Sequence, residues 1–198
     1  MVMKQRLLAS ILLLTVMVSP SGSFAADFQK GMDAAERGDF ATALKEWNPL
    51  AEQGDAHTQY NLGVMYQEGR GVTQNNKTAV KWYTRAADQE DASAQNNLGH
   101  MYQNGKGVPE DHGEAFKWYR LAANQGVADA QLNLGVMYGY GYGVIQDYAR
   151  ALMWWTIAAS QGHETARKNR DIIEKKMFPA DVSKAKKLAK EWMDKHQK

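Results

Sequence analysis

Residues 130–144 read AQLNLGVMYGYGYGV, and closely similar stretches occur 36 and 72 residues earlier in the chain. The earlier copies are AQNNLGHMYQNGKGV and TQYNLGVMYQEGRGV. In the three consecutive 36-residue segments 54–89, 90–125 and 126–161, fifteen positions are identical in all three copies. A repeat of this length is typical of solenoid proteins, in which small structural units stack on one another.

Each 36-residue unit is predicted to contain two helices. In the first unit Leu62, Met65 and Tyr66 have helical spacing, and the sequence Gly-x-Gly-Val follows. Glycine adopts the backbone angles that end a helix without steric cost. Residues that cap helix N-termini recur before the second helix of each unit: Asn75, Asp111 and Asp147. The predicted fold is all-α, a right-handed α/α superhelical solenoid of stacked helix-turn-helix repeats.

The glycines near residue 140 belong to this repeat. Gly141 and Gly143 correspond to glycines in both earlier copies, so we interpret them as the turn between two helices. Only Gly139 is additional. A phosphate-binding loop would follow a strand and carry Gly-x-Gly-x-x-Gly or Gly-Lys-Ser/Thr, and this stretch has neither pattern.

Positions that recur in every copy are expected to pack one repeat on the next, because each repeat contacts its neighbours through the same surface. Trp82, Trp118 and Trp154 are therefore predicted to be core residues. Small residues that allow helices to approach closely recur as the alanine pairs 86–87, 122–123 and 158–159, and as Gly63, Gly99 and Gly135. Glycine inside a helix otherwise costs about 1 kcal/mol relative to alanine.

The combined motif A-x-x-Q-x-N-L-G-x-M-Y-x-x-G-x-G-V, followed by A-x-x-W-Y/W-x-x-A-A-x-Q, resembles the Sel1-like repeat family, which is related to the tetratricopeptide repeats. Residues 26–53 resemble a shorter, half-length tetratricopeptide-like unit that carries RGDF at 37–40. Residues 162–198 resemble a degenerate final unit that caps the array. In that cap the last helix is expected at 184–196, with Pro179 in the turn before it.

The first 25 residues have the pattern of a secretory signal peptide. Lys4 and Arg6 precede an apolar run of 12 residues, 7–18, and small residues at 23 and 25 suit cleavage after Ala25. A membrane-spanning helix needs about 20 apolar residues, so we expect no stable span after cleavage. The chain is predicted to be exported, with the periplasm favoured and secretion as the alternative. It has no cysteine, so burial rather than disulfides must stabilise it.

Charge argues against nucleic-acid binding. Without residues 1–25, 22 basic residues face 22 acidic ones, whereas binding to phosphates requires an excess of positive charge. The charge is uneven along the chain, because residues 163–198 contain 11 basic and 6 acidic side chains. The resemblance implies that the chain is an adaptor for another protein or peptide. In bacteria some such proteins are exported and act in envelope functions or host interaction.

If the first helices line the concave face, positions that differ between copies form the binding groove. The predicted groove residues are Tyr60, Val64, Gln67 and Glu68 in the first unit, Asn96, His100, Gln103 and Asn104 in the second, and Leu132, Val136, Tyr140 and Tyr142 in the third. The start of each unit contributes His57, Ser93 and Asp129, and the cap contributes Thr165, Lys168, Ile172, Lys175 and Lys176.

Two groups of residues have alternative interpretations. Asn61, Asn97 and Asn133 either bond adjacent repeats to each other or form an amide ladder that holds a peptide backbone. Tyr140 and Tyr142 replace polar residues of the earlier copies at the turn. They either anchor an interface, as exposed tyrosine often does, or pack on the cap near Ile172 and Met177.

Catalytic, metal and cofactor sites are not predicted. The five histidines lack the spacing of metal ligands, and no serine lies in Gly-x-Ser-x-Gly. Two alternatives to the adaptor hypothesis stay open. One is binding or hydrolysis of β-lactams or peptidoglycan, as described for some exported Sel1-like proteins that carry paired cysteines absent here. The other is a self-associating structural scaffold; otherwise we expect a monomer or weak self-association.

Overall fold

A computed structural model describes residues 21–196 of the 198-residue chain. These residues form ten α-helices and no β-strand, which confirms the all-α solenoid. The helices are α1 (Ser21–Glu36), α2 (Phe40–Glu52), α3 (Ala56–Glu68), α4 (Asn76–Ala87), α5 (Ala92–Gln103), α6 (His112–Asn124), α7 (Ala128–Tyr140), α8 (Tyr148–Ser160), α9 (Glu164–Glu174) and α10 (Pro179–His196). The apolar run of the predicted signal peptide lies outside the described residues.

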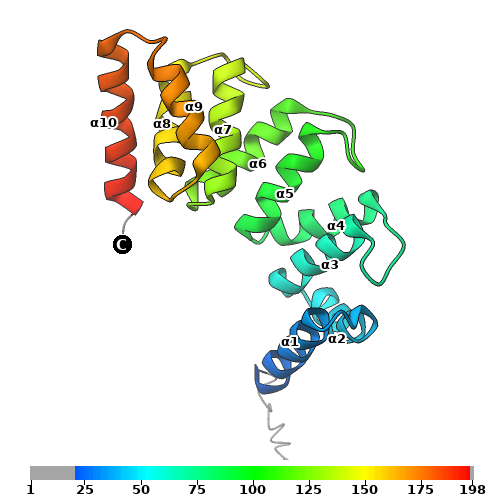
Figure 1. Cartoon of the computed structure of the whole chain (residues 1–198). Coiled ribbons are helices and arrows are strands. Elements are labelled where there is room, and N and C mark those ends of the chain that lie inside the picture. Colours follow the sequence, from blue (N-terminus) through cyan, green and yellow to red (C-terminus); the bar gives the residue numbers. More distant parts are fainter. Residues whose placement is uncertain (1–20, 197–198) are drawn as a thin grey trace, which may run out of the picture.

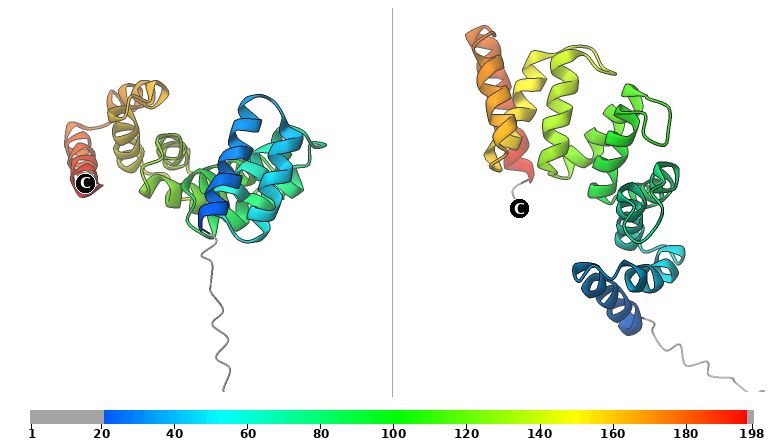
Figure 2. Two further views of the ribbon diagram at one scale, coloured as in Figure 1. Left: turned by 90° about the horizontal axis from the view of Figure 1, so that it is seen from below. Right: turned by 45° about the vertical axis from the view of Figure 1, so that its right-hand side comes forward.

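The helices follow one another along a curved arc, with α1 and α10 at opposite ends (Figure 1). From α1 to α8 each helix packs mainly on the helices before and after it in the sequence, as a solenoid requires, whereas α9 and α10 both pack on α8. The loops that join α3 to α4, α5 to α6 and α7 to α8 project on the same side of the arc in both Figure 1 and the right-hand view of Figure 2. Residues at these loops therefore form a series along one edge of the molecule.

Glycine at the inter-helix loops is required by backbone geometry. Gly69 and Gly141 have φ of 71° and 75°, and each donates its N–H to the carbonyl of the methionine four residues earlier. Gly143 also has positive φ, and a Cβ atom there would collide with the carbonyl of His112 in α6. The turn interpretation of Gly141 and Gly143 is confirmed.

The second helices begin at the predicted capping residues. The side chains of Asn75, Asp111 and Asp147 accept hydrogen bonds from backbone N–H groups three residues later, at 3.1, 3.0 and 2.9 Å. These bonds satisfy donors that have no partner inside the helix.

The core lies between the helices and contains the three predicted tryptophans. Trp82, Trp118 and Trp154 are all buried, and Trp82 packs with core residues of α2 and α3. The helix glycines make this packing possible: a Cβ at Gly63 would lie 2.5 Å from the Tyr83 ring, and one at Gly99 would lie 2.8 Å from Tyr119. The predicted close approach of helices at these glycines is confirmed.

The cap differs from the prediction at its last helix. Helix α10 begins at Pro179 rather than after it, so Pro179 is the first residue of the helix and not part of a turn. The fixed φ of proline suits this position, where its missing N–H costs nothing. Helices α9 and α10 both pack on α8, and Trp192 of α10 meets Trp154 edge to face at 5.7 Å.

Candidate functional site

One aromatic side chain in each second helix lies against the glycine of the preceding first helix. In the first two repeats it is a tyrosine: the hydroxyls of Tyr83 and Tyr119 donate to the Oε1 atoms of Gln67 and Gln103, at 2.8 and 2.7 Å. Burial raises the pKa of both tyrosines, so both hydroxyls stay protonated as donors. Gln67 and Gln103, predicted as groove residues, therefore hold the helices of their own repeats together.

The third repeat replaces this pair. Trp155 stands in place of tyrosine, and its Nε1–H donates to the carbonyl of Leu132 at 3.1 Å. Gly139 stands in place of glutamine, and a Cβ there would lie 3.1 Å from the Trp155 ring. The larger ring needs a smaller neighbour and no side-chain acceptor, which explains the additional glycine of the third copy.

A cavity of about 190 Å³ lies where α7, α8 and α9 meet; we call it the α7–α9 cavity. Trp155 and Ile173 form its buried base, and the side chains around them include both apolar groups and hydrogen-bond donors. Its full lining is Gly139, Tyr140, Gln146, Tyr148, Trp155, Asn169, Ile172, Ile173 and Lys176. A neighbouring depression of about 450 Å³ shares Tyr148 and Lys176 and adds Met177 and Phe178.

Exposed apolar side chains line this cavity and the depression beside it. Tyr140 is 66% exposed and Phe178 is 79% exposed, although burial of an aromatic side chain of this size would stabilise the fold. We define the C-terminal apolar surface as Tyr140, Tyr142, Ile145, Tyr148, Ile172 and Phe178. It extends from the loop between α7 and α8 to the start of α10.

The two tyrosines of the loop have different neighbours. Tyr142 stacks on His112 of the preceding repeat, with ring centroids 5.2 Å apart, and Tyr140 stacks on Tyr142 at 5.6 Å. Tyr140 also lines the α7–α9 cavity together with Ile172 of the cap. Tyr140 thus meets the cap at an open cavity, whereas Tyr142 packs toward the second repeat.

A ladder of glutamines, which we did not predict, joins the repeats. Gln59, Gln95 and Gln131 are buried, and each Nε2 donates to a backbone carbonyl at the end of the preceding helix, at 2.8, 3.3 and 3.1 Å. Each Oε1 accepts a hydrogen bond from the Nε2 of a glutamine 30 residues later, namely Gln89, Gln125 and Gln161. Both series of glutamines recur in all three copies of the repeat, and this recurrence could have been used to predict their structural role.

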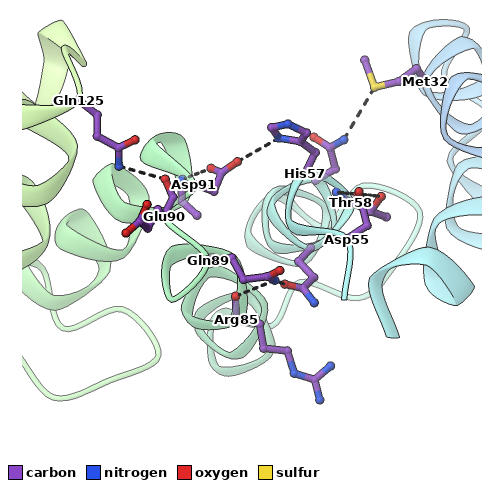
Figure 3. Close-up of polar contacts among 12 residues, drawn as sticks. Met32, Asp55, His57, Thr58, Arg85, Gln89, Glu90, Asp91 and Gln125 are labelled. Atoms are coloured by element: carbon purple, nitrogen blue, oxygen red, sulfur yellow. Dashed lines mark hydrogen bonds and ion pairs between the residues drawn. The ribbon is translucent and has the colours of Figure 1, made fainter. Parts of the chain in front are cut away.

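Polar contacts also cross between repeats at the starts of the first helices. His57 Nδ1 lies 3.1 Å from Asp91, and His163 Nε2 lies 3.0 Å from Asp129, so the two residue types exchange places between the two junctions. Figure 3 shows the first of these contacts, with Gln125 reaching the Glu90 carbonyl beside it. These residues connect repeats, and His57 also lines a depression of about 200 Å³ together with Phe28 and Leu50.

The remaining predicted groove residues are divided between packing and solvent. Asn61 contacts the Met32 sulfur of α1 at 3.8 Å, and Asn97 lies beside the Tyr60 and Tyr83 hydroxyls, so both asparagines contact the preceding repeat. Half-buried positions are Tyr60, Val64, Asn96, Leu132, Val136 and Asn133, whereas Glu68, His100 and Asn104 are exposed. Burial, and then Lys106, lower the pKa of His100. Peptide binding by these residues stays a prediction.

Within residues 21–196, no three His, Asp or Glu side chains come close enough to hold a metal ion. The helices of this part of the chain are also too short or too polar to cross a membrane.

The fold and the glycine-aromatic packing define an α-solenoid of helix-turn-helix repeats. The Sel1 repeat profile matches residues 56–91, 92–127 and 128–163. The chain belongs to the Sel1 repeat family. Proteins built from these repeats are typically non-enzymatic scaffolds for protein interaction.

Two solved structures are similar. A Sel1 repeat protein from Oxalobacter formigenes is 32% identical, with a TM-score of 0.70 over 74% of this chain and 58% of that one. A protective antigen present in uropathogenic Escherichia coli strains, displaying an SLR fold, is 31% identical, with a TM-score of 0.55 over 89% of this chain and 46% of that one. The chain therefore spans about half the length of these relatives. A search of curated proteins found no match.

Proposed function

We propose that this protein is an exported scaffold that binds another protein through its C-terminal apolar surface. One observation carries the proposal: of the seven large apolar side chains exposed in the described residues, six lie between residues 140 and 178. Four of the six line the α7–α9 cavity or the depression beside it: Tyr140, Tyr148, Ile172 and Phe178. Apolar side chains scattered singly over a surface need no explanation, but a gathered group is typical of an interaction site. The seventh is Leu121, in α6.

The type of side chain supports a protein partner. Three of the six are tyrosines, which offer a large apolar face and a hydroxyl at little cost in conformational entropy. The predicted groove residues Tyr140, Tyr142 and Ile172 belong to this surface. Polypeptide binding is also the general role of the family.

Crosslinking tests this proposal. A photo-crosslinking amino acid at position 140, introduced in the native cells, should yield one dominant product with another protein, and Tyr148→Ala should remove it. The same amino acid at position 121 is the matched control, because Leu121 is exposed and apolar but lies outside the surface. Equal products from both positions, or none from 140, would contradict the proposal. Products joining two copies of the chain would favour the self-association alternative.

Export is supported by the position of the N-terminal core. Among the described side chains of α1, Phe28 and Met32 pack against the core, and both follow the predicted cleavage site at Ala25. Cleavage after Ala25 would keep Phe28 and Met32 in the mature chain. The mass of the protein isolated from cells should therefore correspond to a chain that begins at Ala26. A mass that includes residues 1–25 would contradict export by this signal.

A further inference from the structure

We infer that the α7–α9 cavity receives one apolar side chain of a partner polypeptide, and that Lys176 pairs with a carboxylate next to that side chain in the partner's sequence. This inference rests on the proposed function and specifies the chemistry of the partner. It starts from a comparison of the third repeat with the two before it.

The cavity exists because two repeated residues have changed together. In the first two repeats a glutamine occupies the position of Gly139, and its side chain bonds the tyrosine that corresponds to Trp155. In the third repeat the glutamine side chain is absent, and the Trp155 N–H is already satisfied by the Leu132 carbonyl. The amide that the repeat itself places at the cavity, Gln146, is also satisfied, because its Nε2 donates to the Gly139 carbonyl at 2.8 Å.

The cap contributes to the cavity one polar residue that also occurs in the repeats, Asn169. Asn169 lies 36 residues after Asn133, so it is the fourth member of the series that begins with Asn61. Asn97 of that series lies beside the Tyr83 hydroxyl, but at the third junction a tryptophan replaces the tyrosine. Within residues 21–196 the Asn169 side chain makes no hydrogen bond, although it lines the cavity.

The size and lining of the cavity suit one apolar side chain. Its volume of about 190 Å³ compares with a cavity of about 150 Å³ that holds a benzene ring in another protein. Trp155 and Ile173 at the base are 5% and 8% exposed, so the inner end of an inserted ring or branched chain would contact buried side chains. Tyr140, Tyr148 and Ile172 supply the walls.

The charge at the cavity specifies the neighbouring residue of the partner. Lys176 lines both the cavity and the neighbouring depression, and among the described residues it has no ion-pair partner. No acidic side chain lines the cavity itself. In the depression, Asp147 caps α8 and pairs with Arg150, and Asp181 lies in the first turn of α10, where the helix dipole stabilises a carboxylate. A carboxylate of the partner would thus meet Lys176 and the Asn169 amide.

A selection from a random displayed peptide library tests the inference directly. Peptides enriched on the purified protein should share an aromatic or branched apolar residue with Asp or Glu close to it. The double variant Gly139→Gln/Trp155→Tyr should bind them at least about tenfold more weakly, because it refills the cavity with the pair found in the first two repeats. That pair packs well twice in this chain, so the variant is expected to fold.

Lys176→Glu is the second variant, and its exposed position does not threaten folding. It should shift the enriched peptides from acidic to basic residues beside the apolar one. Equal binding of the selected peptides by the double variant, or enrichment without an acidic residue, would overturn the inference. Binding to anionic phospholipid vesicles that Lys176→Glu abolishes, with no peptide enriched, would also overturn it and indicate a membrane surface. If these results overturn the inference but position 140 still crosslinks a partner protein, the proposed function stands. If position 140 crosslinks no partner either, both the inference and the proposed function fail.

Discussion

At the scale of single residues, the aromatic side chain of the second helix determines which residue its neighbour can be. A buried tyrosine hydroxyl needs an acceptor, and Tyr83 and Tyr119 find it in glutamines four residues after the helix glycine. Tryptophan uses a backbone carbonyl instead: Trp155 bonds Leu132, and Trp47 bonds Phe28 at 3.3 Å. The corresponding neighbours of the two tryptophans are small, Gly139 and Ala35. Each pair should therefore tolerate a joint exchange better than a single one.

The helix glycines give a stability prediction. Gly135→Ala should lower the free energy of unfolding by about 2 kcal/mol or more, because a Cβ there would lie 2.5 Å from the Trp155 ring. Gly113→Ala is the control: it lies in α6, and its Cβ would approach only the Asp111 carboxylate at 3.2 Å, so a change below about 1 kcal/mol is expected. Urea unfolding measures both, and similar losses would show that close helix approach is not the reason for these glycines.

The glutamine ladder gives a second prediction at this scale. Gln95→Ala removes a buried amide and with it two hydrogen bonds, one to the Ala87 carbonyl and one from the Gln125 amide. At about 1 kcal/mol for each bond, the loss should cost about 2 kcal/mol of unfolding free energy. Gln53→Ala, at an exposed position, should change it by less than about 0.5 kcal/mol. A Gln95→Ala protein as stable as the parent in thermal and urea unfolding would rule out a stabilising ladder.

At the scale of the helices, capping explains where most of them begin. Six of the seven helices from α2 to α8 start after an Asp or Asn side chain that accepts a hydrogen bond from the first turn. These residues are Asp39, Asp55, Asn75, Asp91, Asp111 and Asp147, at the starts of α2 to α6 and α8. Helix α7 begins after Val127, which cannot cap and packs against the core. At its start the third repeat thus has an apolar contact of Val127 with the core in place of the capping hydrogen bond of the other repeats.

Cap removal should weaken a helix by a predictable amount. Asp111→Ala should lower the free energy of unfolding by about 1 kcal/mol, because the Glu114 N–H loses its acceptor at the start of α6. Asp111→Asn keeps an acceptor oxygen and should be nearly neutral. Equal effects of the two substitutions in urea unfolding would indicate that charge, and not the hydrogen bond, acts at this position.

The helices and loops could be predicted from the sequence because the repeat shows them three times. Recurrent glycines and capping residues mark where helices end and begin, and Trp82 and its equivalents mark the core. The sequence predicts a last helix that begins at residue 184, whereas α10 begins at Pro179. Proline is common both in turns and at the first position of a helix, so its presence alone does not distinguish the two. The α7–α9 cavity could not be predicted, because it depends on how Gly139 and Trp155 lie against α9, which has diverged from the repeat.

At the scale of the whole molecule, the arc has two different ends (Figure 2). The cap covers the last repeat: Ala166 and Ile173 of α9 and Ala185 and Ala189 of α10 are buried with the core residues of α8. The cap is also the basic part of the chain, with 11 basic and 6 acidic residues in 163–198. It thus covers α8 and contributes Ile172, Lys176 and Phe178 to the proposed binding surface.

Loss of the cap should therefore change the state of association. A chain that ends at residue 163 would expose Trp154 and Ile157, which are 6% and 1% exposed in the intact protein. We expect this shortened chain to form oligomers or aggregates in sedimentation velocity, and the intact chain to remain monomeric at the same concentration. A shortened chain that stays monomeric and folded would show that the third repeat needs no cap.

The central claim is that the repeated residues stabilise the solenoid while the residues that depart from the repeat at the α7–α9 junction bind the partner. The most direct test is to compare Gly139→Gln/Trp155→Tyr with the parent for both thermal unfolding and capture of the partner crosslinked at position 140. We predict an unchanged or higher unfolding temperature together with loss of capture. Capture at the parental level by a folded variant would contradict the claim.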